Sequence, residues 1–525
     1  MYHSIQMIGA TDAGGADNFP RQPATVTHSI RTHSTAARRA AVLISALAAA
    51  IVSCKKDATA PIAGTQLVFT VQPSNSMIDS AIVPGIVVTV EDGSGNVATT
   101  SNALITIAIA ANPGNGNLGG TATIAASGGV ATFPYMSVTR PGNGYTLTAS
   151  ATNLTTATSA AFNITSVTNG LWASVSAGGS STCGVTVAGK AYCWGSGNLG
   201  QLGNGSTQRF AVPTAVSGGI SFGFVGTGGL DSYSCGLSTA GAAYCWGYDD
   251  FGQLGNGSTN NSLVPAAVNG NLAFSSLSVG AGGHACALTA GGAAYCWGYN
   301  NSGQLGVGAV GFSAAPVAVS GALSFTSLSA GESGETCGLA AGGAAYCWGF
   351  NGDGELGNGT LTNSNTPVAV SGGLAFKSIS AGFASTCGIT LAGAAYCWGD
   401  NTYGELGNGS TTASRTPVAV SGGLTFKSVS VGDAFACGVT TGGAAYCWGY
   451  NGSGQLGIGN VTAHSSPAAV AEGITFASVS SSYATSCALT PAGAAYCWGD
   501  NSFGQVGNGA TGINIFPELV ATPPQ

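Results

Sequence analysis

The tripeptide Cys-Trp-Gly occurs seven times in the C-terminal two thirds of this chain, at intervals of 50 to 52 residues. Each copy lies in a repeat that reads F-x-S-V-S-x-G, a short variable loop, C-x-L-T-x-x-G-x-A-Y-C-W-G, x-N-x-x-G-Q-L-G-N-G and P-V-A-V-S-G-G. The runs are of strand length, and a four-stranded sheet cannot bury both faces until neighbouring copies stack against it. The repeats therefore predict a seven-bladed β-propeller over residues 171–525. We expect the seven tryptophans to pack between the blades and the glycines to serve turns and close packing.

The composition agrees with an all-β fold rich in turns. The 525 residues include 86 glycines, and only 6% are charged, whereas about a quarter is usual in soluble proteins. The formal net charge is −7, which offers no basic surface for a phosphate backbone or an anionic lipid. Nucleic acid is therefore not the expected partner.

The first 53 residues read as an export signal with a long N-terminal extension over residues 1–39. Arg38 and Arg39 precede an apolar run, residues 40–52, that has the length of a signal-peptide core and is too short to span a bilayer. The long extension fits an upstream start codon. We therefore expect the mature protein to be exported.

The end of this run, Ile51-Val52-Ser53-Cys54, resembles the lipobox of bacterial lipoproteins. The resemblance implies that Cys54 is lipidated and becomes the new N-terminus, and that Lys55 directs the protein to the outer membrane. The expected location is the outer membrane or cell surface, with the lipid anchor as the only membrane contact. The alternative is an ordinary signal peptide cut near residues 48–50, with Cys54 incidental.

Residues 54–64 read as the lipidated cysteine and a short tether. Residues 65–168 differ in composition and read as a separate β-rich domain. Strand-like runs at residues 67–71, 86–90 and 105–109 are separated by turn signals. They predict a β-sandwich. The ordered phrases FTVQPSN, VTVEDGSGNV, GGVATF and GYTLTAS resemble bacterial immunoglobulin-like domains of surface proteins. The resemblance implies a stalk or adhesive module that carries no chemistry.

The repeats themselves carry a second resemblance. The run Gly252–Gly257, G-Q-L-G-N-G, and the Tyr-x-Trp-Gly motif resemble the repeats of the regulator of chromosome condensation family. The founding member of that family exchanges nucleotide on a small GTPase and binds chromatin, through an insertion and a basic surface that these repeats lack. We expect neither activity here. The closer analogy is with secreted bacterial relatives that inhibit β-lactamases and bind their partner through one face of the disc.

Fourteen of the fifteen cysteines form seven pairs with a ten-residue offset, one pair in each repeat. This offset places each pair on adjacent antiparallel strands around a Gly turn, within disulfide reach, and an exported protein can oxidise them. A metal site is one alternative, but C-x9-C lacks zinc-ligand spacing and the repeats contain only His284 and His464. Free buried thiols are the other. We predict seven disulfides, no metal site and no cofactor. The pairs are Cys183–Cys193, Cys235–Cys245, Cys286–Cys296, Cys337–Cys347, Cys387–Cys397, Cys437–Cys447 and Cys487–Cys497.

The link lengths also predict how the ring closes. The Ser-Gly-Gly link between the fourth run and the next first run is short enough for a hairpin, whereas the link from Cys-Trp-Gly to Pro-Val-Ala-Val is long. Blades should then be offset from repeats, which leaves the first blade one strand short. We expect Pro517–Val520 to supply that strand and tie the ends of the ring together.

The variation between repeats is concentrated on one face of the predicted disc. In an up-and-down sheet the first and third connections lie on one face, and the Gly turn and the last link lie on the other. The first and third connections carry aromatic and acidic residues, which are typical of a protein-binding face. Solvated loop decoration is the alternative. The candidate partner-binding residues are Tyr233, Tyr248, Asp249, Asp250, Phe251, Tyr299, Phe350, Tyr403, Asp433, Phe435, Tyr450, Tyr483 and Phe503.

These patterns favour a binding module over an enzyme. The chain shows no Ser, His and Asp set in a recognisable context and no recurring pair of carboxylates. We predict an exported surface protein whose propeller binds a protein or glycan of basic character. One alternative is a propeller enzyme acting on surface glycans, which convergent carboxylates on the wall of the central channel would favour. The other is a structural or adhesive surface protein without a single partner.

Overall fold

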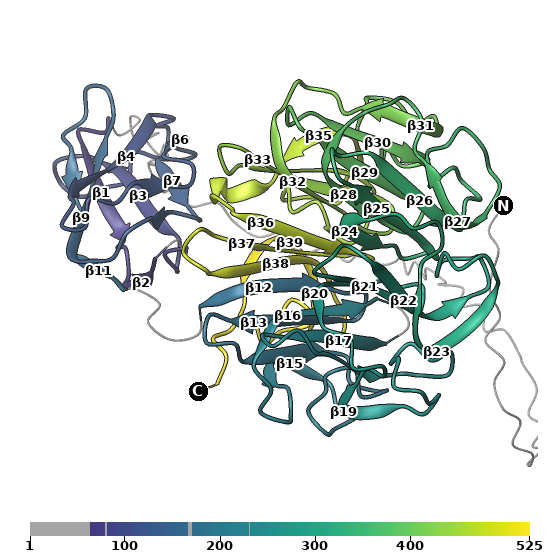
Figure 1. Cartoon of the computed structure of the whole chain (residues 1–525). Coiled ribbons are helices and arrows are strands. Elements are labelled where there is room, and N and C mark those ends of the chain that lie inside the picture. The colour runs from purple at the N-terminus through teal and green to yellow at the C-terminus, as the bar shows by residue number, and fades with distance from the viewer. Residues whose placement is uncertain (1–62, 79–80, 166–170, 230–231, 525) are drawn as a thin grey trace, which may run out of the picture. The chain divides into compact units, whose positions relative to one another are not determined.

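The structure is a computed structural model that describes residues 63–78, 81–165, 171–229 and 232–524. The export segment and Cys54 lie outside these residues, so the signal peptide and the lipid anchor stay predictions. Apart from one 3-10 turn, η1 (Ala471–Gly473), every regular element in the described ranges is a β-strand, which confirms the all-β prediction (Figure 1). None of these elements is a helix of the length and hydropathy needed to cross a membrane.

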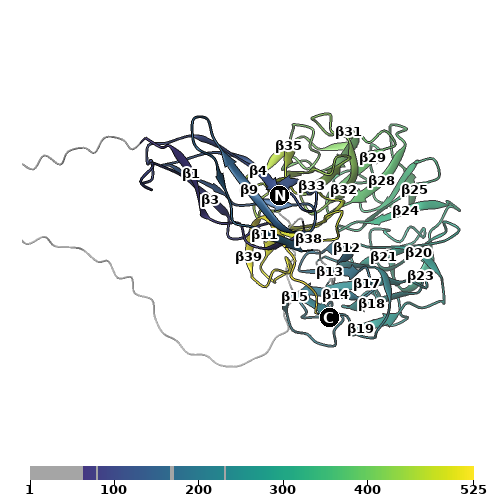
Figure 2. The ribbon, with the colours of Figure 1, turned by 90° about the vertical axis from the view of Figure 1, so that its left-hand side faces the viewer.

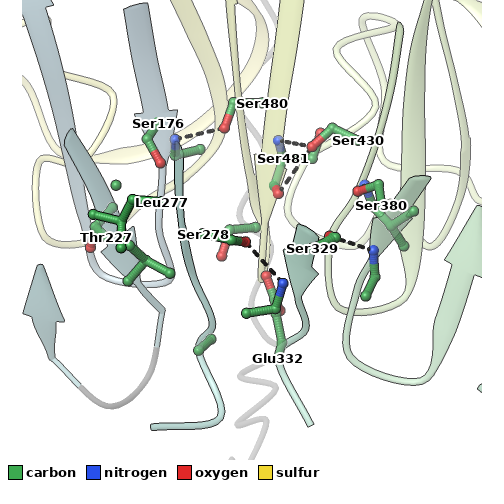
Figure 3. Close-up of a pocket in the computed structure, with 18 of the residues that line it drawn as sticks. Ser176, Thr227, Leu277, Ser278, Ser329, Glu332, Ser380, Ser430, Ser480 and Ser481 are labelled. Carbon is green, nitrogen blue, oxygen red and sulfur yellow. Dashed lines mark hydrogen bonds between the residues drawn. The ribbon is translucent and has the colours of Figure 1, made fainter. Parts of the chain in front are cut away.

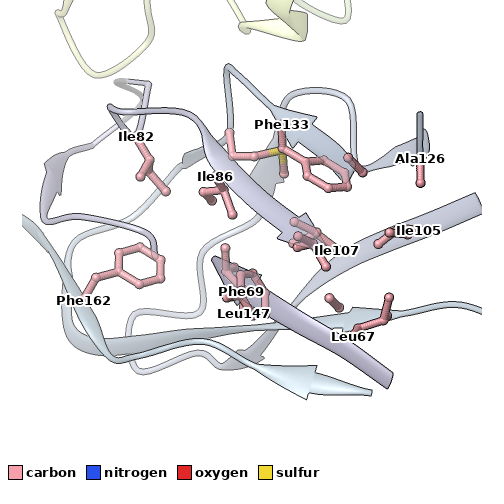
Figure 4. Close-up of a cluster of buried hydrophobic side chains, with 14 of the residues drawn as sticks. Leu67, Phe69, Ile82, Ile86, Ile105, Ile107, Ala126, Phe133, Leu147 and Phe162 are labelled. Atoms are coloured by element: carbon pink, nitrogen blue, oxygen red, sulfur yellow. The ribbon is translucent and has the colours of Figure 1, made fainter. Parts of the chain in front are cut away.

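Residues 66–165 form two main sheets around one hydrophobic core (Figure 4). The strands are β1 (Gln66–Val71), β2 (Ser76–Met77), β3 (Ile86–Glu91), β4 (Leu104–Ala111), β5 (Leu118–Gly119), β6 (Thr123–Ala125), β7 (Val130–Phe133), β8 (Ser137–Val138), β9 (Gly142–Ser150), β10 (Ala157–Thr158) and β11 (Phe162–Thr165). One sheet has the order β1-β3-β7 and the other β2-β11-β9-β4-β6, with β10 paired to β9, while β5 and β8 form a small ribbon. The three strands predicted from the sequence are present as β1, β3 and β4.

Alternation along the strands builds this core. In β9 every second side chain is buried, at Tyr145, Leu147 and Ala149, and in β4 the buried residues are Ile105 and Ile107. Because successive side chains of a strand point to opposite faces of its sheet, each strand contributes one apolar row to the interior.

Each of the seven repeats forms one four-stranded antiparallel sheet, and the sheets succeed one another along the chain (Figures 1 and 2). The first strands are β12 (Trp172–Ala177), β16 (Phe222–Gly228), β20 (Phe274–Val279), β24 (Phe325–Ala330), β28 (Phe376–Ala381), β32 (Phe426–Val431) and β36 (Ser478–Ser482). The second strands are β13 (Ser181–Thr186), β17 (Tyr233–Ser238), β21 (His284–Thr289), β25 (Glu335–Ala340), β29 (Ser385–Thr390), β33 (Phe435–Thr440) and β37 (Thr485–Leu489). The third strands are β14 (Ala191–Gly195), β18 (Ala243–Gly247), β22 (Ala294–Asn300), β26 (Ala345–Gly349), β30 (Ala395–Gly399), β34 (Ala445–Gly449) and β38 (Ala495–Asn501). The fourth strands are β15 (Phe210–Ala215), β19 (Ser262–Ala267), β23 (Gly311–Ala318), β27 (Ser364–Ala369), β31 (Ser414–Ala419), β35 (His464–Ala469) and β39 (Gly512–Leu519).

All seven predicted disulfides are present in the structure. Each joins directly opposite residues of the second and third strands, as Cys183 and Cys193 do in the first sheet. The Cα atoms of each pair lie 4.0 to 4.1 Å apart. The ten-residue offset therefore placed the cysteines correctly, because a Gly turn midway between them fixes the register of the hairpin.

The repeated tryptophans are fully buried between neighbouring sheets, as the sequence predicts. Trp246 donates its indole N–H to the carbonyl of Gln201 in the preceding repeat, at 3.0 Å. A side chain on Gly203, at φ 65°, would lie 2.6 Å from that indole nitrogen. The second glycine of the G-Q-L-G run is thus required both by its backbone conformation and by its contact with the tryptophan.

The seven sheets close into a ring, the arrangement of a propeller. The first strands of neighbouring sheets lie next to one another all the way round, in the order β12-β16-β20-β24-β28-β32-β36 and back to β12. The junction between the last and first repeats is like the others, since Trp194 donates to the Gln505 carbonyl at 2.9 Å.

The predicted strand exchange at the ring junction is wrong. The C-terminal strand β39 pairs with β38 of its own repeat, with Leu519 opposite Tyr496, and the first sheet already has four strands of its own. The third connection is long enough to return the chain to the strand that it left, so each repeat completes its own sheet. The ends meet instead through Trp172 N–H on the Gly493 carbonyl, at 2.9 Å.

Candidate functional site

The candidate site is the face of the ring formed by the first and third connections of the sheets, which we call the variable face. The first connection joins strands one and two of a sheet, and the third joins strands three and four. The opposite face, which we call the turn face, is formed by the second connections and by the links to the next sheet. Antiparallel pairing in every sheet puts the two kinds of connection at opposite ends of the strands.

Backbone hydrogen bonds join the first connections of the fourth to seventh sheets to one another. In each case an N–H of one connection donates to a carbonyl of the next, with N···O distances of 2.6 to 3.2 Å. These connections therefore form a continuous rim rather than independent loops. The bonds run from Glu332 to Gly382, from Phe383 to Gly432 and from Asp433 to Tyr483.

A buried amide holds the third connections in shape. In the fifth sheet Asn401 donates to the carbonyls of Ser410 and Thr412, at 3.1 and 3.0 Å, and accepts the Leu406 N–H at 3.0 Å. In the second sheet, Asp249 occupies the position that corresponds to Asn401, and its carboxylate accepts the Leu254 N–H at 2.9 Å. Asp249 is fully buried, and this burial raises its pKa to about 6. The sequence prediction that Asp249 contacts a partner is therefore wrong, because the side chain holds its own loop.

The residue before Leu in the G-Q-L-G run supports the same connections. Its side-chain oxygen accepts the backbone N–H two residues earlier, as Gln201 does from Leu199 at 2.9 Å. Two repeats carry a glutamate here, Glu355 and Glu405, and both are buried. Burial raises the pKa of each to about 7. A protonated carboxyl can donate and accept like the amide that it replaces.

Aromatic side chains in or beside the third connections form pairs between neighbouring sheets. Phe251 and Tyr299 have ring centroids 5.0 Å apart, and Tyr403 and Tyr450 have centroids 4.9 Å apart. Phe251, Tyr403 and Tyr450 each retain 38 to 41% of their exposure. Pairs of this kind hold large apolar surfaces in fixed orientations, which suits contact with another molecule.

Acidic residues lie between these aromatics on the variable face. Asp250 is exposed and accepts the Tyr248 hydroxyl at 2.8 Å. Partial burial and the nearby Asp400 raise the pKa of Asp353, and burial raises the pKa of Asp433 to about 6. The face therefore has a negative potential that favours a positively charged partner.

Two further predicted contact residues, Tyr233 and Phe435, are fully buried. The Tyr233 hydroxyl lies 2.9 Å from the Gly280 carbonyl oxygen, and Phe435 belongs to a hydrophobic cluster between the sixth and seventh sheets. The prediction that Tyr233 and Phe435 contact a partner is wrong. Each is the first residue of a second strand, two residues before the cysteine, and its side chain packs between neighbouring sheets. The other predicted residues reach the surface, and they are Tyr248, Asp250, Phe251, Tyr299, Phe350, Tyr403, Asp433, Tyr450, Tyr483 and Phe503.

Basic residues are sparse across the described ring, and most lie away from the variable face. Lys377 and Lys427 donate to the Phe426 and Phe476 carbonyls, at 3.0 and 2.8 Å, where the next first strand begins. Lys190 lies in a Gly turn. Arg209 and Arg415 are near the variable side, at the starts of fourth strands, and the Arg209 guanidinium donates to the Ser502 carbonyl at 3.2 Å. The two faces of the ring therefore differ in charge.

The first strands surround a central cavity of about 310 Å³ (Figure 3). The sequence analysis named no candidate residue in this cavity, although the second serine of the F-x-S-V-S run recurs in six of the seven repeats and lines it. Glu332 is the one carboxylate among the described residues that line the cavity. The convergent carboxylates that would favour an enzyme are not found in this lining. The serines at this position are Ser176, Ser278, Ser329, Ser380, Ser430 and Ser480.

Comparison with known proteins places the repeats in one sequence family. The model of the Regulator of chromosome condensation (RCC1) repeat matches more than half of the chain, and a second RCC1 repeat model matches in the same region. The first model matches residues 188–226, 240–288, 291–334, 342–389, 392–439 and 442–489. The second matches residues 172–201, 274–304, 376–405, 426–455 and 476–505.

Similar curated proteins match over part of their length. The Ultraviolet-B receptor UVR8 of Arabidopsis thaliana is 39% identical over 138 residues, 26% of this chain and 31% of that protein. The human E3 ubiquitin-protein ligase HERC2 is 30% identical over 201 residues, 37% of this chain and 4% of that protein. The chain thus spans less than a third of the length of these relatives.

Solved structures share the fold at low sequence identity. Prp20p of Saccharomyces cerevisiae, described with its binding properties to Gsp1p and histones, aligns with a TM-score of 0.56 and 20% identity over 67% of this chain and 87% of its own. Human WBSCR16 aligns with a TM-score of 0.55 and 16% identity over 73% of this chain and 97% of its own. These likenesses support the propeller fold.

Proposed function

Because the chain belongs to the Regulator of chromosome condensation (RCC1) repeat family, we propose that residues 171–525 form a seven-bladed β-propeller that binds a protein partner through its variable face. The observation that carries the proposal is the difference between the two faces. Exposed aromatic pairs and acids gather on the variable face, whereas the turn face repeats nearly the same short Gly turns.

The partner should carry basic residues around an apolar centre. Complementary charge steers the encounter of two proteins, and buried aromatic anchors supply most of the affinity. Phe251 is exposed and its ring is held against the half-buried Tyr299, which gives the pair the fixed geometry of such an anchor. Asp250 lies beside Phe251 in sequence. Asp353 and Asp433 provide further negative charge on the same face.

The test is capture of partners with the full chain as bait, followed by binding kinetics with the captured protein. Phe251→Ala and Tyr299→Ala should speed dissociation by an amount equivalent to about 1–4 kcal/mol if either is a hot spot. Ala242→Ser in a Gly turn is the control and should leave the kinetics unchanged. If the control weakens binding and the aromatic variants do not, the partner binds the other face. Capture of a glycan would redirect the partner class, and the absence of any saturable binding would favour the adhesive alternative.

We also propose that the protein is exported and lipid-anchored. Seven disulfides in one domain suit an oxidising compartment, and the lipobox-like end of the apolar run supports Cys54 as the anchor. Cys54→Ser should release the protein from membranes into the soluble fraction. Retention of this variant in a detergent-extractable membrane fraction would contradict the anchor.

We propose an immunoglobulin-like module for residues 65–168. One contact supports this class: the buried Tyr145, near the start of β9, donates its hydroxyl to the Arg140 carbonyl at 2.9 Å. A tyrosine that bonds back to the chain a few residues upstream is a recurring feature of immunoglobulin-like sandwiches. The module would act as a stalk for the propeller.

A further inference from the structure

The central cavity has a hydroxyl-lined wall. Ser329, Ser380 and Ser480 each accept a backbone N–H from the first strand of the next sheet, at 2.9 to 3.1 Å. A serine oxygen has two lone pairs, so the second lone pair of each of these oxygens can accept a hydrogen bond from a group inside the cavity. The volume of about 310 Å³ is within the range of small-molecule sites.

The belt of serines is interrupted at the second repeat, where the wall becomes apolar. Gly226 takes the serine position there, and a side chain on it would lie 3.0 to 3.1 Å from Val279 and the Phe224 ring. Phe224, Leu277 and Val279 line the cavity on this side. The cavity therefore combines one apolar wall with one wall of hydroxyl groups.

Glu332 lies at one end of this cavity and reaches across it. It belongs to the first connection of the fourth sheet, yet its carboxylate oxygens lie 3.2 and 3.3 Å from the Tyr483 nitrogen in the seventh sheet. The Ser482 side chain also donates a hydrogen bond to it. These contacts hold the carboxylate beside the serine and apolar walls (Figure 3).

The charges around Glu332 have one sign. The titratable groups that interact with it are Asp433, Glu335 and the Tyr483 phenol. Among the described residues that line the cavity there is no Lys, Arg or His. Burial, with a smaller contribution from Asp433, raises the pKa of Glu332 to about 7. A carboxylate without a counter-charge in a confined site is stabilised by any cation that enters.

We propose that the central cavity binds a small organic ammonium ion, with the ammonium group at Glu332 and the apolar body against Phe224 and Leu277. The negative lining disfavours anions. One carboxylate with hydroxyl groups is a poor set for Ca²⁺, which takes six to eight oxygens. Glu332 belongs to the rim of the variable face but is not one of the exposed residues proposed for partner contact. The ammonium titration needs no protein partner, so either proposal can fail alone.

Binding of such a cation is coupled to the ionisation of Glu332. The bound cation favours the charged carboxylate, so affinity is highest above the pKa of about 7 and falls as the pH drops through it. Cyclohexylammonium chloride is a suitable probe, because its amine stays protonated across this range. Calorimetric titration of the full chain should show affinity about tenfold higher at pH 8 than at pH 5.5.

A single substitution separates charge from structure. Glu332→Gln keeps an acceptor for the Tyr483 N–H but removes the charge, and it should lower the affinity at pH 8 by about tenfold and abolish the pH dependence. The control is Glu518→Gln, an exposed acid of β39 outside the cavity, which should bind the probe like the unmodified chain. Thermal melts of both variants establish that they are folded.

Four outcomes would overturn the proposal. The first is failure of the unmodified chain to bind the ammonium probe. The second is equal binding of the probe by Glu332→Gln, and the third is equal affinity for the neutral analogue cyclohexanol. Preferential binding of glucose would instead identify a polyol site and would also contradict the proposal.

Discussion

The two faces of the ring solve the same connection problem in different ways. On the turn face, Gly393 at φ 90° closes a hairpin in which its N–H donates to the Thr390 carbonyl at 2.8 Å. On the variable face the longer third connection is held by buried side chains such as Asn401, which satisfies three backbone groups. Because buried residues fix the conformation of the third connection, its exposed residues can differ between repeats. The variable face therefore carries most of the sequence differences between repeats.

The largest expected effect is the loss of this internal scaffold. Asn401→Ala leaves one N–H and two carbonyls without their side-chain partner, which should lower the free energy of unfolding by about 2–4 kcal/mol. Chemical denaturation measures this value. Ala392→Ser, at an exposed position of the turn face in the same repeat, is the control and should change it by less than about 0.5 kcal/mol. Equal effects would remove the distinction between the faces.

The buried acids of the variable face should make the stability of the protein depend on pH. Asp249, Glu355 and Glu405 occupy positions where other repeats have amides, and burial raises their pKa to about 6, 7 and 7. The folded state then binds more protons than the unfolded state, so stability is present at low pH and is lost as the pH rises toward 7.

Glu355→Gln and Glu405→Gln should each stabilise the protein by about 1–3 kcal/mol at pH 8 and have little effect at pH 4. Asp249→Asn should act in the same direction with a smaller change. Melting temperatures across this pH range test the prediction. An equal gain at both pH values would show that packing, not ionisation, separates the acid from the amide.

Substitution of turn-face glycines that have a positive φ should lower the stability of the protein. Gly393→Ala places a Cβ 2.5 Å from the Thr425 methyl at a positive φ, and should cost about 1–2 kcal/mol. Gly423→Ala, at φ 64° with open space around the new Cβ, should cost about 1 kcal/mol or less. Denaturation of the two variants side by side measures the steric part of the penalty. The reverse order would mean that the hairpins relax around the added methyl group.

The smallest effect on stability is expected at the exposed acids of the variable face. Asp353→Asn should change the free energy of unfolding by less than about 0.5 kcal/mol. It should nevertheless slow association with a basic partner and flatten the salt dependence of the association rate, since exposed charges act over about a Debye length. Stopped-flow kinetics at two ionic strengths make the measurement. An unchanged association rate would place the partner away from Asp353.

The features predicted correctly from the sequence depend on the spacing of residues within one repeat. The opposed cysteines Cys183 and Cys193 flank a turn whose glycine fixes the hairpin register. The strands, the disulfides and the burial of the tryptophans follow from such spacing and from the number of repeats. The repetition itself tested the pattern seven times within one chain.

The candidate site was predicted less well. Tyr233 and Phe435 look like loop residues, but a shift of one or two residues in a strand boundary turns a side chain from solvent to the interior. Asp249 resembles a surface acid until the N–H of Leu254 is seen to need an acceptor. No local pattern distinguishes these cases.

The sequence by itself determined the repeating all-β unit, its disulfides and the face on which variation gathers, because each depends on residues close together in the chain. The tertiary structure alone decided that β39 completes its own sheet, which loop residues are buried, and that Glu332 reaches Tyr483 across the central cavity. The contact between Glu332 and Tyr483 joins repeats 151 residues apart in the chain. Such contacts are fixed only when all the sheets pack together.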